Sequence, residues 1–371
     1  MDLQNKSYWD LSEEDVQVIA EQLRTKAQAD HRARIPLDRL DAEHHAIFTR
    51  AINNVLSTEL AVFTYAQIVD GLPTEDVAYD ARYPGLFGEH PINEHENLCP
   101  GAMEKARELC KAWKPEMLSF NPELVNSFQQ AAPGSKEFET RLIELVAVTL
   151  HQFGIILYQL DLRLHRGDIE STVTWRMPPE PRLLDIPPRP TLFNHQEYLD
   201  DAIYPDGVAE LVGYWAENRI LGGVVLFDRK GEGSRNRLEP PNVYFHPSRE
   251  RLTHRIVQLR DDQQRALVDF LQSDPANTPD ASVPSPLPVL VDKENPVRVD
   301  SHKATLVHQI YRDIWERKPL PSDDVSYREK RPQGEVDYPA IRGSLYRINA
   351  MHGLHPPEKG KQTQDRGDLF R

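Results

Sequence analysis

Proton-carrying side chains recur on one face of a long apolar segment, residues 136–166. His151, Tyr158 and His165 are spaced by seven residues, so a helix would bring all three to the same side. Asp161 precedes His165 by four residues, which is close enough on a helix to orient the imidazole and favour its protonated form. Because a carboxylate-held imidazole is a common general base, these four residues are the predicted catalytic groups. The alternative is a set of buried polar groups that satisfy neighbouring loops, with Asp161 and His165 reaching solvent at the helix end.

Glu59 is the fifth predicted catalytic residue. It falls on the apolar face of a helix predicted over residues 38–69, where an unpaired carboxylate is costly, and it could face His151. In the alternative, the helix is rotated so that Glu59 lies at the edge of the core.

Three residues are predicted to bind an anion, because positive charge gathers around residues 229–255 of a chain that is acidic overall. They are Arg219, Arg229 and His246. Solvated loop arginines would give the same pattern, and the acidic helical half of the chain is an alternative docking partner.

Possible metal ligands are densest in the segment that contains His90, Glu94, His95, Glu96 and Cys99. The segment has no HExxH and no paired ExxH spacing, so a solvated acidic loop is favoured and no metal ligand is assigned. No metal ligand is assigned to His44 with His45, or to the aspartates at 200, 201 and 206 either. Asp206 is expected to cap a helix. Phosphate-loop, dinucleotide, GxSxG and kinase signatures are also missing, so the predicted chemistry uses no organic cofactor.

Composition limits the class of partner. A net charge of −14 argues against a nucleic-acid surface, which needs clustered Lys and Arg. The uncharged run from Leu145 to Leu160 is shorter than the ~20 residues that span a bilayer, so we expect no membrane segment. The first residues are polar and acidic, unlike a secretory signal, and the two cysteines make no disulfide framework. A cytoplasmic location is predicted.

The elements that position these residues form two parts. Residues 1–176 are predicted as a helical bundle, with a capping box at Ser12 and a fully apolar central helix that starts after Ser135. Six prolines make residues 177–203 a connector. Residues 204–274 are predicted as a helix, a three-stranded antiparallel meander and a second helix.

The remaining segments are predicted as a Pro/Ser-rich linker over 275–300, a helix over 301–318 and a polar, loosely ordered tail over 319–371. The expected fold class is therefore mainly α with a small α+β part, in which an N-terminal helical bundle packs on a three-stranded antiparallel sheet with flanking helices.

One stretch carries a family resemblance. The run Tyr204-Pro205-Asp206-Gly207, followed by residues 209–217 and 222–229, resembles a segment of uncharacterised proteins of filamentous ascomycete fungi. The resemblance extends over about residues 204–274 and implies no activity. Fungal proteins of this kind are often accessory to secondary metabolism or development, which is an association only.

The function predicted from the sequence is a cofactor-independent enzyme that performs acid–base chemistry on a small hydrophobic metabolite. The alternative is a non-catalytic accessory protein that binds a protein partner through its linker or C-terminal tail. A metal-dependent enzyme has the least support, and the sequence does not determine an oligomeric state.

Overall fold

The structure is a computed structural model that describes residues 7–80, 89–176, 188–230, 242–249, 252–274, 284–295 and 297–324. The helices are α1 (Glu13–Arg32), α2 (Ala42–Leu56), α3 (Glu59–Asp70), α4 (Glu75–Asp80), α5 (Ala102–Ala112), α6 (Pro122–Gln130), α7 (Lys136–Gln159), α8 (Ile169–Val173), α9 (Val208–Leu221), α10 (Asp261–Gln272) and α11 (Ser301–Lys303). Single helical turns are η2 (Tyr8–Asp10), η3 (Leu37–Arg39), η4 (Pro91–Glu94), η5 (Pro115–Met117) and the π-helical η6 (Ala304–His308). The strands are β1 (Val224–Asp228), β2 (Val243–His246), β3 (Ile256–Gln258), β4 (Arg298–Val299) and β5 (Ile310–Tyr311).

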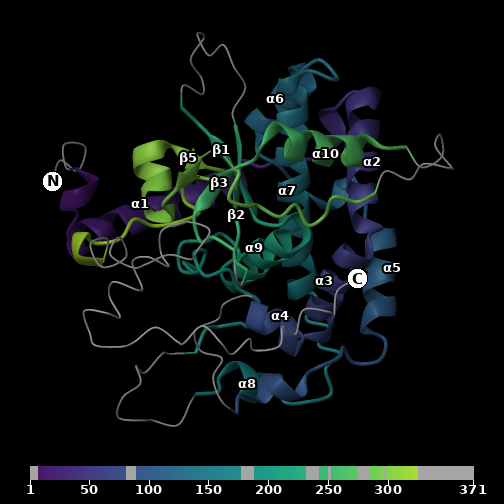
Figure 1. Ribbon diagram of the computed structural model, residues 1–371, viewed down its shortest axis with the longest axis vertical. Helices are drawn as coiled ribbons and strands as arrows, with labels where there is room; N and C mark the ends of the chain where they lie inside the picture. Colours follow the sequence, from purple (N-terminus) through teal and green to yellow (C-terminus); the bar gives the residue numbers. More distant parts are fainter. Residues whose placement is uncertain are drawn as a thin grey trace, which may run out of the picture.

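The predicted fold class is confirmed at the coarse level, because the chain is mainly helical with one small antiparallel sheet (Figure 1). The sheet has five strands in the order β4-β3-β2-β1-β5, not three. Its central three are the predicted meander. The two additional strands pair only two residues each, β4 with β3 and β5 with β1. Such short strands carry no alternation of their own and form because a longer strand offers them an unpaired edge.

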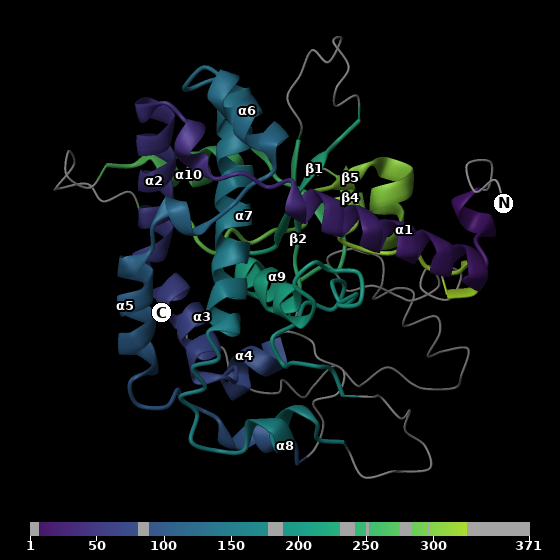
Figure 2. The ribbon, with the colours of Figure 1, turned by 180° about the vertical axis from the view of Figure 1, so that it is seen from behind.

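Alternate residues of the sheet belong to two different hydrophobic cores. Val225 and Phe227 of β1 join the core of α2, α3, α7 and α10. Val224 and Leu226 face a second core, which contains Ala27 of α1 together with residues of the 198–204 segment. Both faces are covered, so the sheet lies between the helical bundle and a second layer that includes α1 (Figures 1 and 2).

Helix α7 is the central element of the bundle. Ser135 caps it by accepting a hydrogen bond from the backbone N–H of Phe138, as predicted. The helix is long and apolar enough to cross a membrane, but 78% of its most apolar window is buried within the fold. That environment is typical of the core helix of a soluble protein.

Two long predicted helices are shorter in the structure. The helix predicted over 38–69 is divided into α2 and α3, because the Thr58 side chain caps a new helix at the backbone N–H of Ala61. Helix α7 ends at Gln159 instead of continuing to about 166. Asp161 and Arg163 beyond it have positive φ angles of 50° and 41°, which no continuing right-handed helix permits.

The helix predicted over 301–318 is wrong. Only α11 and the single turn η6 are helical, and Gln309 then adopts a left-handed conformation with φ 56°. The next two residues become β5 and pair with Phe227 and Asp228 of β1. In this segment, pairing with the edge of the sheet therefore determines the structure, and the helical pattern of apolar residues does not.

Parts of the predicted connector and linker and most of the predicted tail fall outside the described residues. These parts are 177–187 of the Pro-rich connector, 275–283 and 296 of the linker, and 325–371 of the tail. The described part of the linker is not all irregular, since it contributes β4.

Candidate functional site

A network of buried charged side chains joins α7, α9 and the segment after β5. His151 Nε2 of α7 lies 2.6 Å from Glu210 Oε2, and its Nδ1 lies 3.5 Å from Glu217 Oε2. Arg312 donates from Nη1 to both carboxylate oxygens of Glu217 at 2.8 Å. Glu210 and Glu217 are seven residues apart on α9 and thus share the face that meets α7.

Gly213, between the two glutamates, makes room for the imidazole. A Cβ atom at this position would lie 2.7 Å from His151 Nε2, closer than any real contact. The histidine is held from its other sides by Tyr214, whose ring centroid is 4.4 Å away, and by the two carboxylates. The network therefore fixes the orientation of His151.

The two carboxylates determine the protonation of His151. Burial disfavours the imidazolium, but hydrogen bonding and charge from Glu210 and Glu217 outweigh burial and raise the pKa of His151 above its usual value. Burial likewise opposes the glutamate charges, but His151 and Arg312 lower the pKa of Glu210 and of Glu217. The raised pKa favours the imidazolium form of His151, whereas a general base must be unprotonated to accept a proton.

The network continues to a second buried arginine. The Glu316 carboxylate accepts hydrogen bonds from the backbone N–H groups of Arg312 and Asp313, at 3.0 and 3.2 Å. Arg317 donates to the other oxygen of Glu316 at 3.1 Å and to the carbonyl of Ser301. The guanidinium of Arg317 also lies over the ring of Tyr198, 5.3 Å from its centroid.

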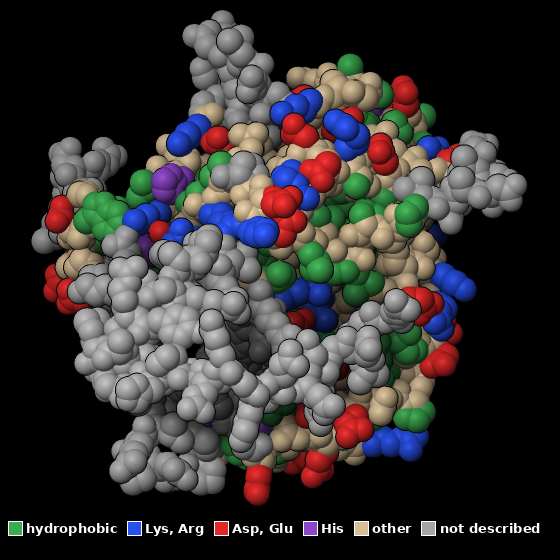
Figure 3. Space-filling model, viewed as in Figure 1, with side chains coloured by type: hydrophobic (Ala, Val, Ile, Leu, Met, Phe, Trp, Pro, Cys, Tyr) green, Lys and Arg blue, Asp and Glu red, His purple; other side chains and the backbone are tan. Residues whose placement is uncertain are grey.

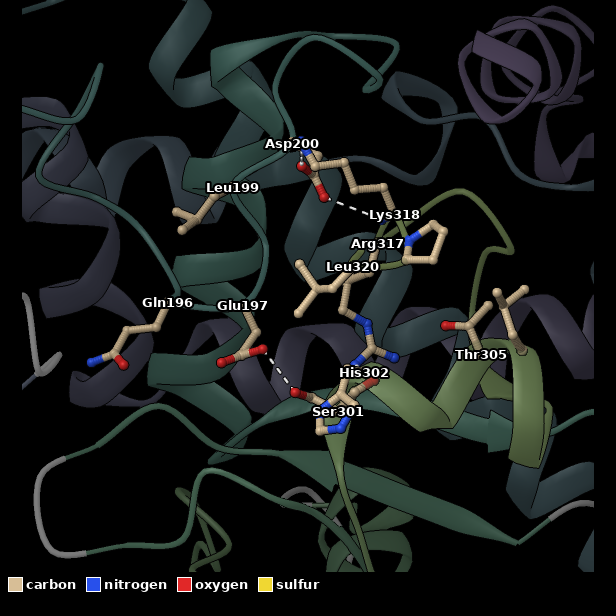
Figure 4. A pocket seen from close by; sticks show the side chains of 12 residues that line it. Gln196, Glu197, Leu199, Asp200, Ser301, His302, Thr305, Arg317, Lys318 and Leu320 are labelled. Atoms are coloured by element: carbon tan, nitrogen blue, oxygen red, sulfur yellow. Dashed lines mark hydrogen bonds and ion pairs between the residues drawn. The ribbon is translucent and has the colours of Figure 1, made fainter. Parts of the chain in front are cut away.

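Arg317 forms part of the wall of a pocket of about 170 Å³, which we call the Arg317 pocket (Figure 4). It lies between three segments, residues 196–200, 301–306 and 317–320. Because one water molecule needs about 10–15 Å³ of such space, the pocket accommodates roughly a dozen water-sized groups. The guanidinium Nε of Arg317 is buried and has no hydrogen-bond partner among the described residues.

Two polar pairs lie on opposite sides of Arg317 in this pocket (Figure 4). Ser301 Oγ donates to Glu197 Oε2 at 2.8 Å. Lys318 Nζ lies 3.1 Å from Asp200 Oδ1, and its backbone N–H donates to the other oxygen of Asp200. Asp200 is thus neutralised by a lysine, which argues against its use as a metal ligand.

The apolar part of the pocket is formed by Leu199, Leu306, Pro319 and Leu320. A buried cation and an apolar wall together suit a small molecule that combines an acidic group with a hydrocarbon body.

The predicted catalytic residues do not gather at one site. Glu59 is the first residue of α3, is largely exposed and lies 3.5 Å from Arg107. Asp161 is exposed and pairs with Arg163, not with His165. Tyr158 is half-buried on α7, and burial raises its pKa.

His165 lies in the segment after α7, where its Nδ1 is 3.5 Å from Cys99 Sγ and 3.9 Å from Asp70 Oδ2. This places it in a cluster separate from His151. Because α7 ends before it, the seven-residue spacing that linked the two histidines does not apply.

The predicted anion contacts are already paired within the protein. Arg219 pairs with Asp80, and Arg229 donates to Glu144 and to the carbonyls of Tyr311 and Arg312. His246 is buried, with its Nε2 3.1 Å from the His254 carbonyl and its Nδ1 3.2 Å from the Tyr198 hydroxyl. None of these three residues lines the Arg317 pocket.

The predicted cap at Asp206 is also wrong. Helix α9 starts after Gly207, which has φ 56°, and no side chain caps it. Asp206 instead accepts a hydrogen bond from Gln159 at 3.3 Å. His44, from one of the other possible metal groups, is held by Asp41 and by the Ala131 carbonyl.

Sequence reasoning missed Glu210, Glu217, Arg312 and Arg317. One signal was present for the first two: glutamates seven residues apart inside a helix whose other residues are mostly apolar. The arginines had no such signal, because they were assigned to the helix predicted over 301–318, which does not extend beyond residue 308.

Comparisons with known proteins identify no relative. No family model matches the chain, and neither a curated protein nor a solved structure is detectably similar to it.

Proposed function

We propose that the chain binds a small organic acid with an apolar body in the Arg317 pocket and acts on it by proton transfer, without an organic cofactor. Arg317 carries this proposal. It is a guanidinium at a pocket wall, held by Glu316, the Ser301 carbonyl and the Tyr198 ring. A cation fixed in this way binds a carboxylate without losing side-chain freedom.

Glu197 is the proposed proton acceptor. Its carboxylate lies in the pocket wall and already accepts an O–H donor, Ser301 Oγ, at 2.8 Å. A general base must lie at about this heavy-atom distance from the group whose proton it removes. The apolar residues of the pocket agree with the small hydrophobic metabolite that the sequence favours, while the site itself differs from the histidine face predicted on α7.

Binding can be tested with three carboxylates that differ in their apolar body, namely benzoate, isovalerate and phenylpyruvate, together with neutral benzamide. We expect at least one carboxylate, and not benzamide, to raise the unfolding temperature of the protein. Leu306→Trp should abolish this rise, because the indole fills the pocket from its rim.

Val307→Trp is the matched control. Val307 is the next residue of the same turn, is similarly exposed and does not line the pocket, so this variant should keep the response. Equal responses of the two variants would contradict binding in the Arg317 pocket.

Catalysis is tested separately with Glu197→Gln, which keeps the size of the side chain and removes the base. Wild-type protein and variant are incubated with a small-molecule extract, and the composition is followed by mass spectrometry. Consumption of a compound by the wild type alone is the expected result. If carboxylates bind and neither protein consumes a compound, the alternative of a non-catalytic accessory protein is favoured.

A further inference from the structure

A second cluster of chemically active side chains lies away from the Arg317 pocket. Asp70 is the last residue of α3, His95 directly follows η4, and His165 lies in the segment after α7. One ligand atom from each, a carboxylate oxygen or an imidazole nitrogen, lies within 4.8 Å of the other two. Cys99 is next to this triad, with its sulfur 3.5 Å from His165 Nδ1.

The distances scatter around those between the ligands of one tetrahedral ion. Zinc–nitrogen and zinc–oxygen bonds of ~2.0–2.2 Å and a zinc–sulfur bond of ~2.3 Å place tetrahedral ligand atoms about 3.3–3.7 Å from one another. His95 Nε2 and His165 Nδ1 lie 3.0 and 3.9 Å from Asp70 Oδ2. Cys99 and His165 fall within this range at 3.5 Å.

Two residues of the triad carry buried polar atoms without hydrogen-bond partners among the described residues. Asp70 is fully buried, yet neither of its carboxylate oxygens has a hydrogen-bond partner among the described residues. His95 Nε2 is also buried without such a partner, although Oδ2 of Asp70 is only 3.0 Å away. Close atoms that do not point at each other are arranged as ligands are around an ion, whereas an uncompensated buried carboxylate is costly.

The position of Asp70 adds to this cost. A carboxylate at the C-terminal end of a helix meets the negative end of the helix dipole, where a cation is normally favoured. A positive ion next to it removes both penalties.

The backbone around the cluster is fixed by bonds between the same segments. The backbone N–H of His165 donates to the Asp70 carbonyl at 2.8 Å, and the N–H of Glu75 donates to the His95 carbonyl at 2.9 Å. At Gly167, a Cβ atom would lie 2.5 Å from His165 Nε2, so this glycine lets the backbone approach the far side of the imidazole ring. The ring is thereby held with Nδ1 toward Asp70 and Cys99.

We propose that Asp70, His95 and His165 bind a zinc ion and that Cys99, whose sulfur is 3.5 Å from His165 Nδ1 but does not lie within 4.8 Å of all three triad atoms, moves in as the fourth ligand when the ion binds. Two imidazoles, a carboxylate and a thiolate are a donor set that suits zinc, and the two anionic ligands balance its charge. Four protein ligands form a closed site, so the ion is structural: it ties the end of α3 to the loop before α5 and to the segment after α7. This site is independent of the proposed function.

The first test uses the full chain after removal of metal with a chelator. Zinc and cobalt are titrated separately, zinc content is measured by mass spectrometry, and cobalt is followed by its absorption spectrum. We expect one equivalent of either ion, a raised unfolding temperature, the visible bands of tetrahedral cobalt and a thiolate-to-cobalt band in the near ultraviolet.

Four variants of the proposed ligands and one control variant complete the test. Asp70→Asn, His95→Ala and His165→Ala should each weaken zinc binding by at least about tenfold, and Cys99→Ser should remove the thiolate band. His31→Ala is the matched control, because His31 also lies beside an aspartate, 3.8 Å from Asp206, but belongs to no such cluster. Circular dichroism at low temperature shows whether each variant is folded.

Two results would overturn the proposal in whole or in part. If folded wild-type protein binds neither zinc nor cobalt more tightly than the folded His95→Ala variant does, the triad is not a metal site. If cobalt binds and the thiolate band is missing, Cys99 is not a ligand and the four-ligand form of the site is wrong.

Discussion

The protonation of His151 determines the net charge of the buried network. Glu210, Glu217 and Glu316 face Arg312 and Arg317 in the buried network, so a protonated His151 brings three negative and three positive formal charges together. Removing one partner of a buried ion pair typically costs 3–5 kcal/mol, because the other charge is left uncompensated. The contribution of His151 to stability depends on its proton.

We predict that His151→Gln lowers the free energy of unfolding by about 3 kcal/mol at pH 6. The pKa of His151 is raised in the folded protein, so its charge stabilises the fold fully below the unfolded pKa near 6.5. This advantage is lost as the pH rises through the folded pKa. Denaturant unfolding of both proteins at pH 6, 7.5 and 9 should show a difference that narrows with pH. The surface variant His31→Gln is the control, and a difference that does not change with pH would contradict a charged His151.

Individual site residues were predictable only where the local segment was predicted correctly. His151 was identified because α7 has a strong pattern and a clear cap at Ser135. Asp70 was missed, although an aspartate that ends an apolar helix directly before Gly71 is a recognisable anomaly. Its partners His95, Cys99 and His165 come from other segments, and no periodicity in a sequence expresses contacts of that kind.

At the scale of elements, the crossing of α7 and α9 positions the buried network. Gly154 of α7 faces Gly213 and Ala216 of α9, and a Cβ atom on Gly154 would lie 3.2 Å from the Ala216 side chain. The two helices therefore approach closely at this point. The close approach brings His151 between the two glutamates of α9.

We predict that Gly213→Ala destabilises the protein by about 1–3 kcal/mol, because the added methyl group collides with a histidine held on several sides. Helix propensity alone would give the opposite sign, since alanine is favoured over glycine by about 1 kcal/mol within a helix. Gly154→Ala is a milder variant for comparison. It should lower the free energy of unfolding less, since the nearest contact of its added methyl group, at 3.2 Å, requires only a small shift. Thermal and denaturant unfolding measure both changes. Stabilisation by Gly213→Ala would show that the crossing is not tight.

Elements with local signals were predictable, and those stabilised by distant partners were not. The capping box of Ser12 and the start of α7 after Ser135 agree with the sequence patterns. In contrast, β4 and β5 have two residues each and depend on the edges of β3 and β1. The second core, on the sheet face that packs against α1, was also missed, because alternation within a strand does not reveal what covers its outer side.

At the scale of the whole molecule, the mixed charges on one face contrast with buried histidines that carry no charge. Acidic and basic side chains are interspersed on the described face in Figure 3. Inside, His195 and His246 are buried, and burial lowers the pKa of His195 to about 4 and that of His246 well below its usual value. Both histidines are therefore neutral in the folded protein, whereas the unfolded chain binds a proton at each below pH 6.5.

We predict a marked loss of stability in mild acid. The folded pKa values of the two histidines are depressed, so the unfolded state takes up more protons as the pH falls from 6.5, and for His195 alone this costs about 3 kcal/mol by pH 4. Glu210 and Glu217, whose pKa values are also lowered, add to the loss below about pH 4.5. Unfolding free energies measured from pH 7 to pH 4 should fall steadily, and a flat profile would contradict neutral buried histidines.

The two-residue strands at both margins of the sheet have a consequence for how the protein behaves at high concentration. Fibril growth through a sheet requires a long row of unpaired backbone donors and acceptors on which an incoming chain can align. In the described part of the chain, β4 and β5 occupy both margins and offer only a few such groups each. The sheet thus ends on each side in a two-residue strand that makes it a poor template for aggregation.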